Sequence, residues 1–559
     1  MNTIYFQNNV GEDALHIHFM YTNDAMNINK ELFFERRMSE SIDMFLERLN
    51  NKVENIFKKK LKKKGRQQDD VSQPSETVKH TQLILNGRLV PKDTVFRELL
   101  CEGDTSDLKL RIEDIDYTIL FNYPLVSNMA LPEQLRVGCP VSPSKLTGHC
   151  INIEESEFKW FKTQNNKWIE CGRGYAYMPQ ECDVDCFLKL ECIPKNDTRT
   201  GPKSEVVSKS VVNSFQFGSE INIRQEHTKI GTQKDEIRFI SYNILADFYT
   251  KTKEAKSSLF TYCDPNYLDI CYRTGLIFKE LSGYNGDVIC LQEVEKKFYT
   301  THLRPFLENL GFNGVFNEKE GSKEGCATFY NTNKFRIIHS AQHIYCEELT
   351  SNAIFKDIKE KISSNVKLME RVTSLPTQLQ TTVLEWFTVC DELIIVGNTH
   401  LYFHPDADHI RLLQGIIGFQ LLLQTAKEQK QMYPNKNVSI IFCGDFNSTP
   451  DCGIFKFMTQ GSVSQDVSDW ESNIEEKIEN VSFSHSLAME SACGAPEFTN
   501  YTEGFKACLD YIYFEANRLS LKSFVPLPKE EVLQKEVAIP SSSFPSDHIP
   551  LIADLKLKS

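Results

Sequence analysis

Four short apolar runs, each ending in polar side chains, constrain the fold of this chain more than any other feature. The runs are IRFISYN, VICLQE, LIIVGNTH and SIIFCGDFN, and they lie between residues 237 and 447. A run of this length is typical of a buried strand. Because α/β folds bind ligands at the ends of strands, the polar residues there should converge. These residues are Asn243, Glu293, His400, Asp445 and Asn447.

Two later segments extend this polar set. CLDYIYF and FPSDHIPLIADL add Asp510, Asp547 and His548 beside further apolar runs. Carboxylates, amides and two histidines without a cysteine partner suit a hard cation such as Mg²⁺ better than Zn²⁺. Taken singly, SDH or GDFN is more often a turn, and a lone strand-end histidine or buried aspartate is more often structural. Together they predict a site that hydrolyses phosphate esters.

The order of these residues resembles that of the exonuclease-endonuclease-phosphatase superfamily of metal-dependent phosphodiesterases, over residues 236–559. Its sequence motifs are similar to those of the deadenylase branch, and most similar to those of the mitochondrial 2′-phosphodiesterases. The motifs are SYNILAD, ICLQEVE, EGCATFY, NTHLYFHP, IIFCGDFNSTP, FTNYTEGFKACLDYIYF and PSDHIPL. The resemblance implies an α/β catalytic domain, a four-layer sandwich of two face-packed mixed sheets with outer helices.

The resemblance also implies a role for each polar residue. Glu293 is expected to be the principal Mg²⁺ ligand, with Asp445 and Asn447 completing the site; Mn²⁺ is an alternative ion, and one or two ions remain open. Asp445 is the expected general base, and Asn447 orients water or phosphate. Asn243 supports this network.

Four further residues are expected to contact the phosphate or to orient the residues that do. His548, backed by Asp547, and His400 are expected to donate hydrogen bonds to the phosphoryl oxygens, at roughly 3 kcal/mol per good donor. Asp510 is expected to orient a histidine.

The segment FTNYTEGF bears on substrate choice. Asn500 and Phe505 match positions where the deadenylase branch recognises adenine, and Pro405 matches a further wall of that pocket. A turn asparagine and a core phenylalanine are the structural alternatives. The implied reaction is 3′-to-5′ hydrolysis of 2′,5′-oligoadenylate and of 3′ poly(A) tails on single-stranded RNA to 5′-AMP, with the preferred linkage open. Glu318 and Glu320 compete for one further substrate contact, which we leave unassigned.

Three other functions compete with this interpretation. An inositol polyphosphate phosphatase would lack FTNYTEGF, and an abasic-site DNA endonuclease would need basic surfaces, whereas the net charge is −13. A non-catalytic RNA-binding scaffold is disfavoured by the complete set of site residues.

The N-terminal region is expected to divide into three parts. Residues 1–64 read as a strand and helix with a basic end, and residues 65–78 as a polar linker. Residues 79–224 read as a β-sandwich-like domain, because short alternating runs are separated by turn residues. The catalytic domain follows at 236–559.

The resemblance implies a mitochondrial location. A transit peptide should be rich in arginine and poor in acids, yet Met1 to Lys30 contains no arginine and three acidic residues. The cytoplasm is therefore the alternative. No apolar stretch approaches the ~20 residues that span a bilayer, so no membrane association is expected.

Overall fold

The structure is a computed structural model that describes residues 2–8, 12–63, 81–101, 105–214 and 219–558. The chain forms two compact units. The first holds residues 1–129, 145–159 and 190–206, and the second holds residues 130–144, 160–189 and 207–559. The predicted linker at 65–78 lies outside the described residues. No helix within the described ranges combines the length and apolarity needed to cross a membrane.

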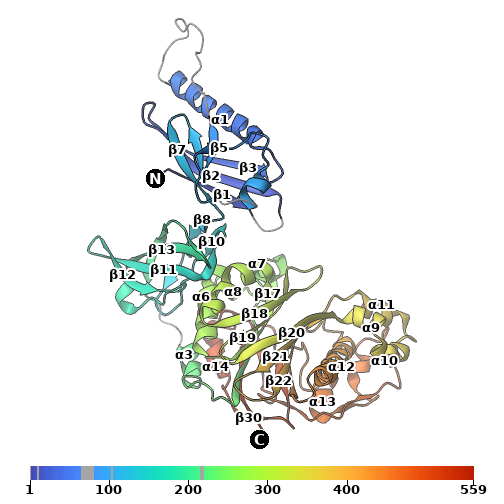
Figure 1. The fold of residues 1–559 in the computed structure, drawn as a ribbon. Helices are drawn as coiled ribbons and strands as arrows, with labels where there is room; N and C mark the ends of the chain where they lie inside the picture. The colour runs from blue at the N-terminus through green and yellow to red at the C-terminus, as the bar shows by residue number, and fades with distance from the viewer. Residues whose placement is uncertain (1, 9–11, 64–80, 102–104, 215–218, 559) are drawn as a thin grey trace. The chain divides into compact units, whose positions relative to one another are not determined.

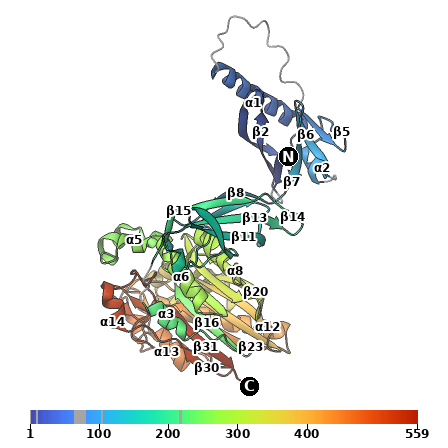
Figure 2. The same ribbon diagram turned by 90° about the vertical axis from the view of Figure 1, so that its left-hand side faces the viewer.

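The first unit contains a sheet with one long helix against it. Over the described residues, its seven strands follow the order β3-β2-β1-β7-β6-β4-β5. Helix α1 lies along one face (Figure 2), where Phe45 and Leu49 pack with Phe6 and Ile17. The elements are β1 (Thr3–Asn8), β2 (Ala14–Asn23), β3 (Ile28–Arg37), α1 (Ile42–Lys63), β4 (Gln82–Leu85), β5 (Arg88–Leu89), α2 (Phe96–Cys101), β6 (Leu108–Ile112) and β7 (Ile115–Phe121).

This sheet corrects the domain boundary expected from the sequence. β1 pairs in parallel with β7, with Ile4 opposite Ile119, so strands from residues 1–64 and strands after residue 79 share one sheet. They are not a separate segment followed by a β-sandwich. Local patterns identify a strand but carry no information about its partner far along the chain, which explains the error.

The remaining N-terminal strands form other sheets, so the expectation of a mainly β region is confirmed. One sheet has the order β12-β11-β13-β15-β9, with β14 paired to β13, and β10 pairs with β8. The elements are β8 (Leu125–Ala130), β9 (Leu135–Arg136), β10 (Lys145–His149), β11 (Asn152–Gln164), β12 (Lys167–Arg173), η1 (Glu181–Asp183), β13 (Phe187–Asn196), β14 (Arg199–Thr200), β15 (Ser204–Asn213) and α3 (Ser219–Glu226).

Two six-stranded mixed sheets form the centre of the second unit. Their orders are β18-β19-β17-β16-β31-β30 and β20-β21-β22-β23-β29-β26. The strands are β16 (Glu236–Asn243), β17 (Val288–Glu295), β18 (Phe312–Glu318), β19 (Glu324–Asn331), β20 (Phe335–Ile344), β21 (Gln378–Trp386), β22 (Glu392–His400), β23 (Asn437–Asp445), β26 (Met489–Ser491), β29 (Asp510–Glu515), β30 (Leu519–Phe524) and β31 (Leu551–Leu557).

The two sheets pack face to face between outer helices, as expected. Phe239 and Val396, from opposite sheets, share one buried cluster. Helices α6 (Ile270–Gly283) and α8 (Arg304–Asn309) cover the sheet that contains β16 (Figure 1). Helices α12 (Asp408–Met432) and α13 (Gly453–Gln460) cover the sheet that contains β23. This is a four-layer α/β sandwich.

A helical insertion joins β20 to β21. It contains α9 (Tyr345–Ser351), η4 (Ala353–Phe355), α10 (Lys356–Ile362) and α11 (Val366–Ser374). Arg371 of α11 donates to Asp406 at 2.7 Å and to Glu476 at 3.0 Å. The insertion is therefore fixed to the loop that follows β22, next to Pro405.

Candidate active site

Strand register brings the predicted polar residues to one edge of the two sheets. On one sheet, His400 lies opposite Asp445, and Asp445 lies opposite Asp510 on the other side. On the facing sheet, Asn243 ends β16 and lies opposite Gln292, the neighbour of Glu293. The convergence expected from the strand ends is therefore present in the fold.

Glu293 lies at a bulge in β17. The register with β19 shifts between Leu291 and Val294, and Glu293 has a φ of 56°, in the left-handed region. Bulges re-aim side chains, and strained backbone is found preferentially at functional sites. The carboxylate accepts from the Ala246 backbone N–H and from Asn243 Nδ2, both at 2.9 Å. Burial and the charge of Asp547 raise the pKa of Glu293 to about 8.

Asp445 lies at the centre of the cluster. Its Oδ2 accepts from Asn243 Nδ2 at 3.1 Å, so one amide group bridges Asp445 and Glu293. Nε2 of His400 and Nε2 of His548 each lie 3.6 Å from the same oxygen. Burial lowers the pKa of His400 to about 4, so this imidazole is neutral at pH 7.

The GDFN turn holds Asp445 in place. The backbone N–H of Asn447 donates to Asp445 Oδ1 at 2.9 Å, and Asn447 Nδ2 donates to the Leu401 carbonyl at 3.0 Å. Gly444 is required here, because it has a φ of 140° and an added Cβ would lie 1.9 Å from the Thr399 carbonyl oxygen. The bond to Leu401 and the close approach of Gly444 to Thr399 hold the turn against the end of β22.

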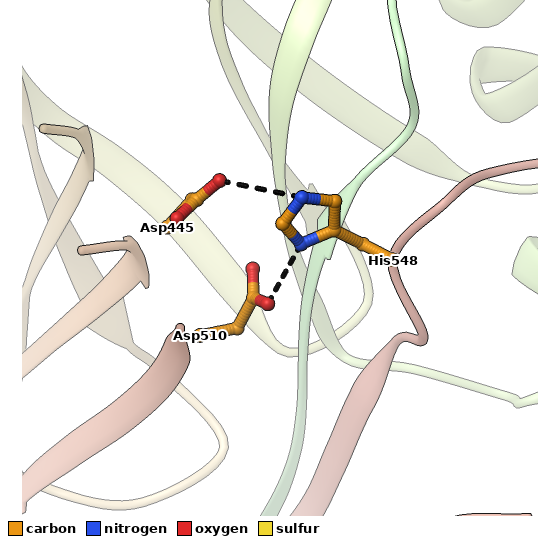
Figure 3. A group of neighbouring side chains, drawn as sticks. All are labelled: Asp445, Asp510 and His548. Atoms are coloured by element: carbon orange, nitrogen blue, oxygen red, sulfur yellow. Dashed lines mark hydrogen bonds and ion pairs between the residues drawn. The ribbon is translucent and has the colours of Figure 1, made fainter. Parts of the chain in front are cut away.

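His548 connects Asp445 to Asp510 (Figure 3). Its Nδ1 lies 2.8 Å from Asp510 Oδ2, while its Nε2 faces Asp445. Burial alone would lower the pKa of His548, but the carboxylates of Asp510 and Asp445 outweigh it and raise this pKa well above its usual value. The imidazole is therefore protonated and positively charged at neutral pH. Asp445, Asp510 and His548 also lie close enough to share a metal ion.

The partner of His548 differs from the one expected. Asp510, and not the adjacent Asp547, is hydrogen-bonded to Nδ1 of His548. Asp547 accepts from Asn500 Nδ2 and from Ser546 Oγ, both at 3.4 Å. The expected orienting role of Asp510 has a direct geometric basis.

The three expected adenine-recognition residues differ in exposure. Asn500, in β27 (Asn500–Tyr501), is 6% exposed and forms a bridge with His548. Phe505 is 52% exposed, which argues against the core alternative, and Pro405 is also exposed. Glu318 pairs with Lys296 at 2.9 Å, and Glu320 is exposed in a turn.

Sequence reasoning missed several supporting residues. Thr499 Oγ1 donates to Asp510 at 2.6 Å, and Ser546 Oγ donates to the Asn243 carbonyl at 2.7 Å. Buried Arg273 donates to the carbonyls of Ile244 and Leu245, which follow Asn243. Thr499 precedes a predicted recognition residue and Ser546 belongs to the SDH motif, so both could have been found. Arg273 gave no signal within its apolar helix.

Comparisons with known proteins match two parts of the chain to known families. The endonuclease/exonuclease/phosphatase family matches residues 240–548, and the 2′,5′-phosphodiesterase 12-like N-terminal domain matches residues 123–213. A solved structure of ANGEL2, described as a 2′,3′-cyclic phosphatase, is 24% identical, covers 58% of this chain and 96% of its own, and has a TM-score of 0.47.

Two curated relatives are similar over much of the chain. 2′,5′-Phosphodiesterase 12 of Mus musculus is 38% identical over 80% of this chain and 76% of its own length. The CCR4-Not complex 3′-5′-exoribonuclease subunit Ccr4 of Schizosaccharomyces pombe is 31% identical over 60% of this chain and 51% of its own length. The chain belongs to the endonuclease/exonuclease/phosphatase family of metal-dependent phosphodiesterases, in the group that contains 2′,5′-phosphodiesterase 12.

Proposed function

We propose that this chain is a Mg²⁺-dependent 3′-to-5′ exoribonuclease and phosphodiesterase that releases 5′-AMP from the ends of 2′,5′-oligoadenylates and 3′ poly(A) tails. One observation carries the proposal. The amide of Asn243 donates to both Glu293 and Asp445, and two imidazoles face the same Asp445 oxygen. This arrangement offers acidic metal ligands, a base and hydrogen-bond donors within one cluster. The two curated relatives are named as a 2′,5′-phosphodiesterase and a 3′-5′-exoribonuclease, and these names support the two proposed linkages.

The residues present fit a divalent cation. The raised pKa of Glu293 reflects buried negative charge that the protein alone stabilises poorly. Among the described residues, Asp510 Oδ1 is buried without a hydrogen-bond partner. We assign Glu293, Asp445 and Asn447 as the ligands, and their oxygen donors favour Mg²⁺, with Mn²⁺ as a substitute. When bound, the cation neutralises phosphoryl and leaving oxygens.

The remaining residues act on water and phosphate. Asp445 takes the proton of the attacking water, and Asn447 orients this water or a phosphoryl oxygen. Protonated His548, held by Asp510, donates to a phosphoryl oxygen as charge develops. Neutral His400 donates to a phosphoryl oxygen through one ring N–H. Asn243 holds the carboxylates of Glu293 and Asp445 in position by donating to both. Asp547 orients Asn500.

Adenine recognition rests on the exposed ring of Phe505, with Asn500 for the hydrogen-bonding edge and Pro405 as a further wall. Stacking on an aromatic ring contributes about 1–3 kcal/mol per base. Recognition of a terminal adenosine leads to stepwise digestion from the chain end. The cellular processes we propose for this activity are mRNA processing and RNA degradation.

We also propose a mitochondrial location, which the resemblance alone supports, with the cytoplasm as the alternative. Fractionation of cells that express the full chain distinguishes the two compartments.

Two substitutions test the proposed activity. Glu293→Ala should reduce oligoadenylate cleavage by several orders of magnitude while the fold survives, and near wild-type turnover at saturating Mg²⁺ would refute the ligand assignment. Asp445→Asn preserves the shape of the turn, so it should bind oligoadenylate without cleaving it. A loss well below the ~100-fold that a general base commonly contributes would contradict its role.

A further inference from the structure

A cavity of about 320 Å³ adjoins Glu293. It is lined by residues 132–144, by residues 244–247, by α6, and by the segment that runs from Glu293 to His302. All four parts belong to the second compact unit. Residues 132–144 precede the catalytic family match and fall within the N-terminal domain match. The cavity is therefore lined both by residues that precede the catalytic family match and by Glu293, the proposed metal ligand.

Close contacts hold this wall against α6. The Arg136 guanidinium lies 3.9 Å from the centre of the Tyr272 ring. At Gly275 an added Cβ would lie 3.2 Å from Cys139 Cβ, so the two segments approach closely. The Tyr272 hydroxyl donates to the Ser542 carbonyl at 2.6 Å, in the segment leading to His548. Tyr272, which lines the cavity, thus links it to the segment that carries His548.

The lining suits a nucleoside. Ile244, Phe278 and Phe298 supply apolar surface, and the His302 ring stacks on Phe298 with centroids 5.3 Å apart. Burial lowers the pKa of His302 to about 4, so this ring is neutral and can hydrogen-bond to an uncharged base. The lining carries charges of both signs, because Lys297 is exposed there and Asp247, Glu293 and Glu295 also line the cavity. Ligand cavities range from roughly 300 to 1,000 Å³, so the size matches one nucleoside and not a strand.

We propose that this cavity binds the leaving nucleoside of an oligoadenylate, the adenosine whose ribose oxygen departs on cleavage. This inference rests on the proposed function: if Asn500 and Phe505 hold the terminal adenosine, the other side of the scissile phosphate must lie elsewhere. In the reaction, a water oxygen bonds to phosphorus and passes its proton to Asp445. The phosphorus–oxygen bond to the ribose breaks, and that oxygen takes the electron pair and a proton from solvent water.

The same cavity gives a physical reason for linkage preference. A 2′ and a 3′ ribose oxygen direct the leaving base along different paths from the phosphate. Because the cavity is fixed relative to Glu293, it accepts one path better than the other. Residues 132–144 and α6 therefore act as specificity determinants outside the metal cluster.

Filling the cavity from two different elements tests this inference. Thr274→Phe fills it from α6, and Thr301→Trp fills it from the π-helical turn η3 (Tyr299–Leu303). Ser282→Phe is a matched control, because Ser282 also donates to the carbonyl four residues earlier in α6 but does not line the cavity. Thermal unfolding checks the fold of all three variants, and the second filling variant serves if the first does not fold.

Two substrates separate the leaving side from the rest of the site. One is 2′,5′-diadenylate, and the other is the p-nitrophenyl ester of 5′-AMP, which has the terminal adenosine and phosphate but no leaving nucleoside. Both filling variants should raise KM for diadenylate about 10-fold more than KM for the ester, the size of a lost stacking contact. They should also change the ratio of 2′,5′ to 3′,5′ cleavage, whereas Ser282→Phe should do neither.

Equal effects on diadenylate and on the ester, or no effect on either, would overturn the leaving-nucleoside site while leaving the proposed function intact. A wild-type protein that cleaves the ester but no oligoadenylate, or cleaves neither substrate, would instead overturn the proposed function. The wild-type measurement therefore distinguishes the two failures.

Discussion

Replacing Asn243 with alanine tests how far the site depends on one amide group. Asn243 Nδ2 donates at 2.9 Å to Glu293 and at 3.1 Å to Asp445, and it is fully buried. The variant removes both bonds and leaves two carboxylates without the donor that they share. Because these carboxylates come from different sheets, their relative position should loosen.

The size of the effect follows from these two bonds. A hydrogen bond to a charged group contributes about 1.5–3 kcal/mol, so two such bonds represent about 3–6 kcal/mol. At roughly 1.4 kcal/mol per factor of ten, kcat should fall about 10²- to 10⁴-fold if the bonds preserve the reactive geometry.

The assay measures kcat on oligoadenylate at saturating Mg²⁺, with circular dichroism and thermal unfolding as fold checks. Asn398→Ala is the control, because Asn398 is an equally buried amide that donates to the carbonyls of Leu291 and Ala327. It should lose stability with a much smaller change in kcat. If Asn243→Ala stays within about 5-fold of wild type, or if both variants lose kcat equally, the bridging role is wrong.

Three further predictions concern recognition and stability. Phe505→Ala should raise KM for oligo(A) and narrow its advantage over oligo(U) and oligo(C); an equal loss on every base would make this ring merely structural. Arg371→Ala removes the guanidinium that pairs with Asp406 beside Pro405. It should raise KM for oligo(A) about 3- to 10-fold, or about 1 kcal/mol, more than it lowers kcat. An unchanged KM would show that this ion pair does not position the loop. Burial raises the pKa of Glu280 to about 7 from the usual 4.5. The folded protein therefore loses stability as pH rises from 4.5 through 7. Glu280→Gln should increase the free energy of unfolding by up to about 3 kcal/mol at pH 8 but little at pH 4, which urea titrations measure. Equal effects at both pH values would show that the charge of Glu280 is not the cause.

The sequence predicted the parts of the site that depend on local pattern. Apolar runs marked the strands, and their polar ends marked Asn243, His400 and Asp445, because the end of a strand lies at the edge of its sheet. The pairing of β1 with β7 was not predictable in this way, since it joins distant segments. The sequence also suggested Asp547 as the partner of His548, whereas the fold supplies Asp510 from a neighbouring strand. Residues 132–144 line the cavity beside Glu293 because of tertiary packing, which no local sequence motif predicts.

The most direct test of the proposed reaction is cleavage of 2′,5′-triadenylate by the purified full chain in H₂¹⁸O, with products identified by mass spectrometry. Water attack at phosphorus predicts stepwise release of 5′-AMP that carries one ¹⁸O in its phosphate. Release should stop when the divalent cation is chelated and resume when Mg²⁺ is restored. Unlabelled 5′-AMP, a cyclic phosphate product, or undiminished cleavage in the presence of chelator would contradict the account.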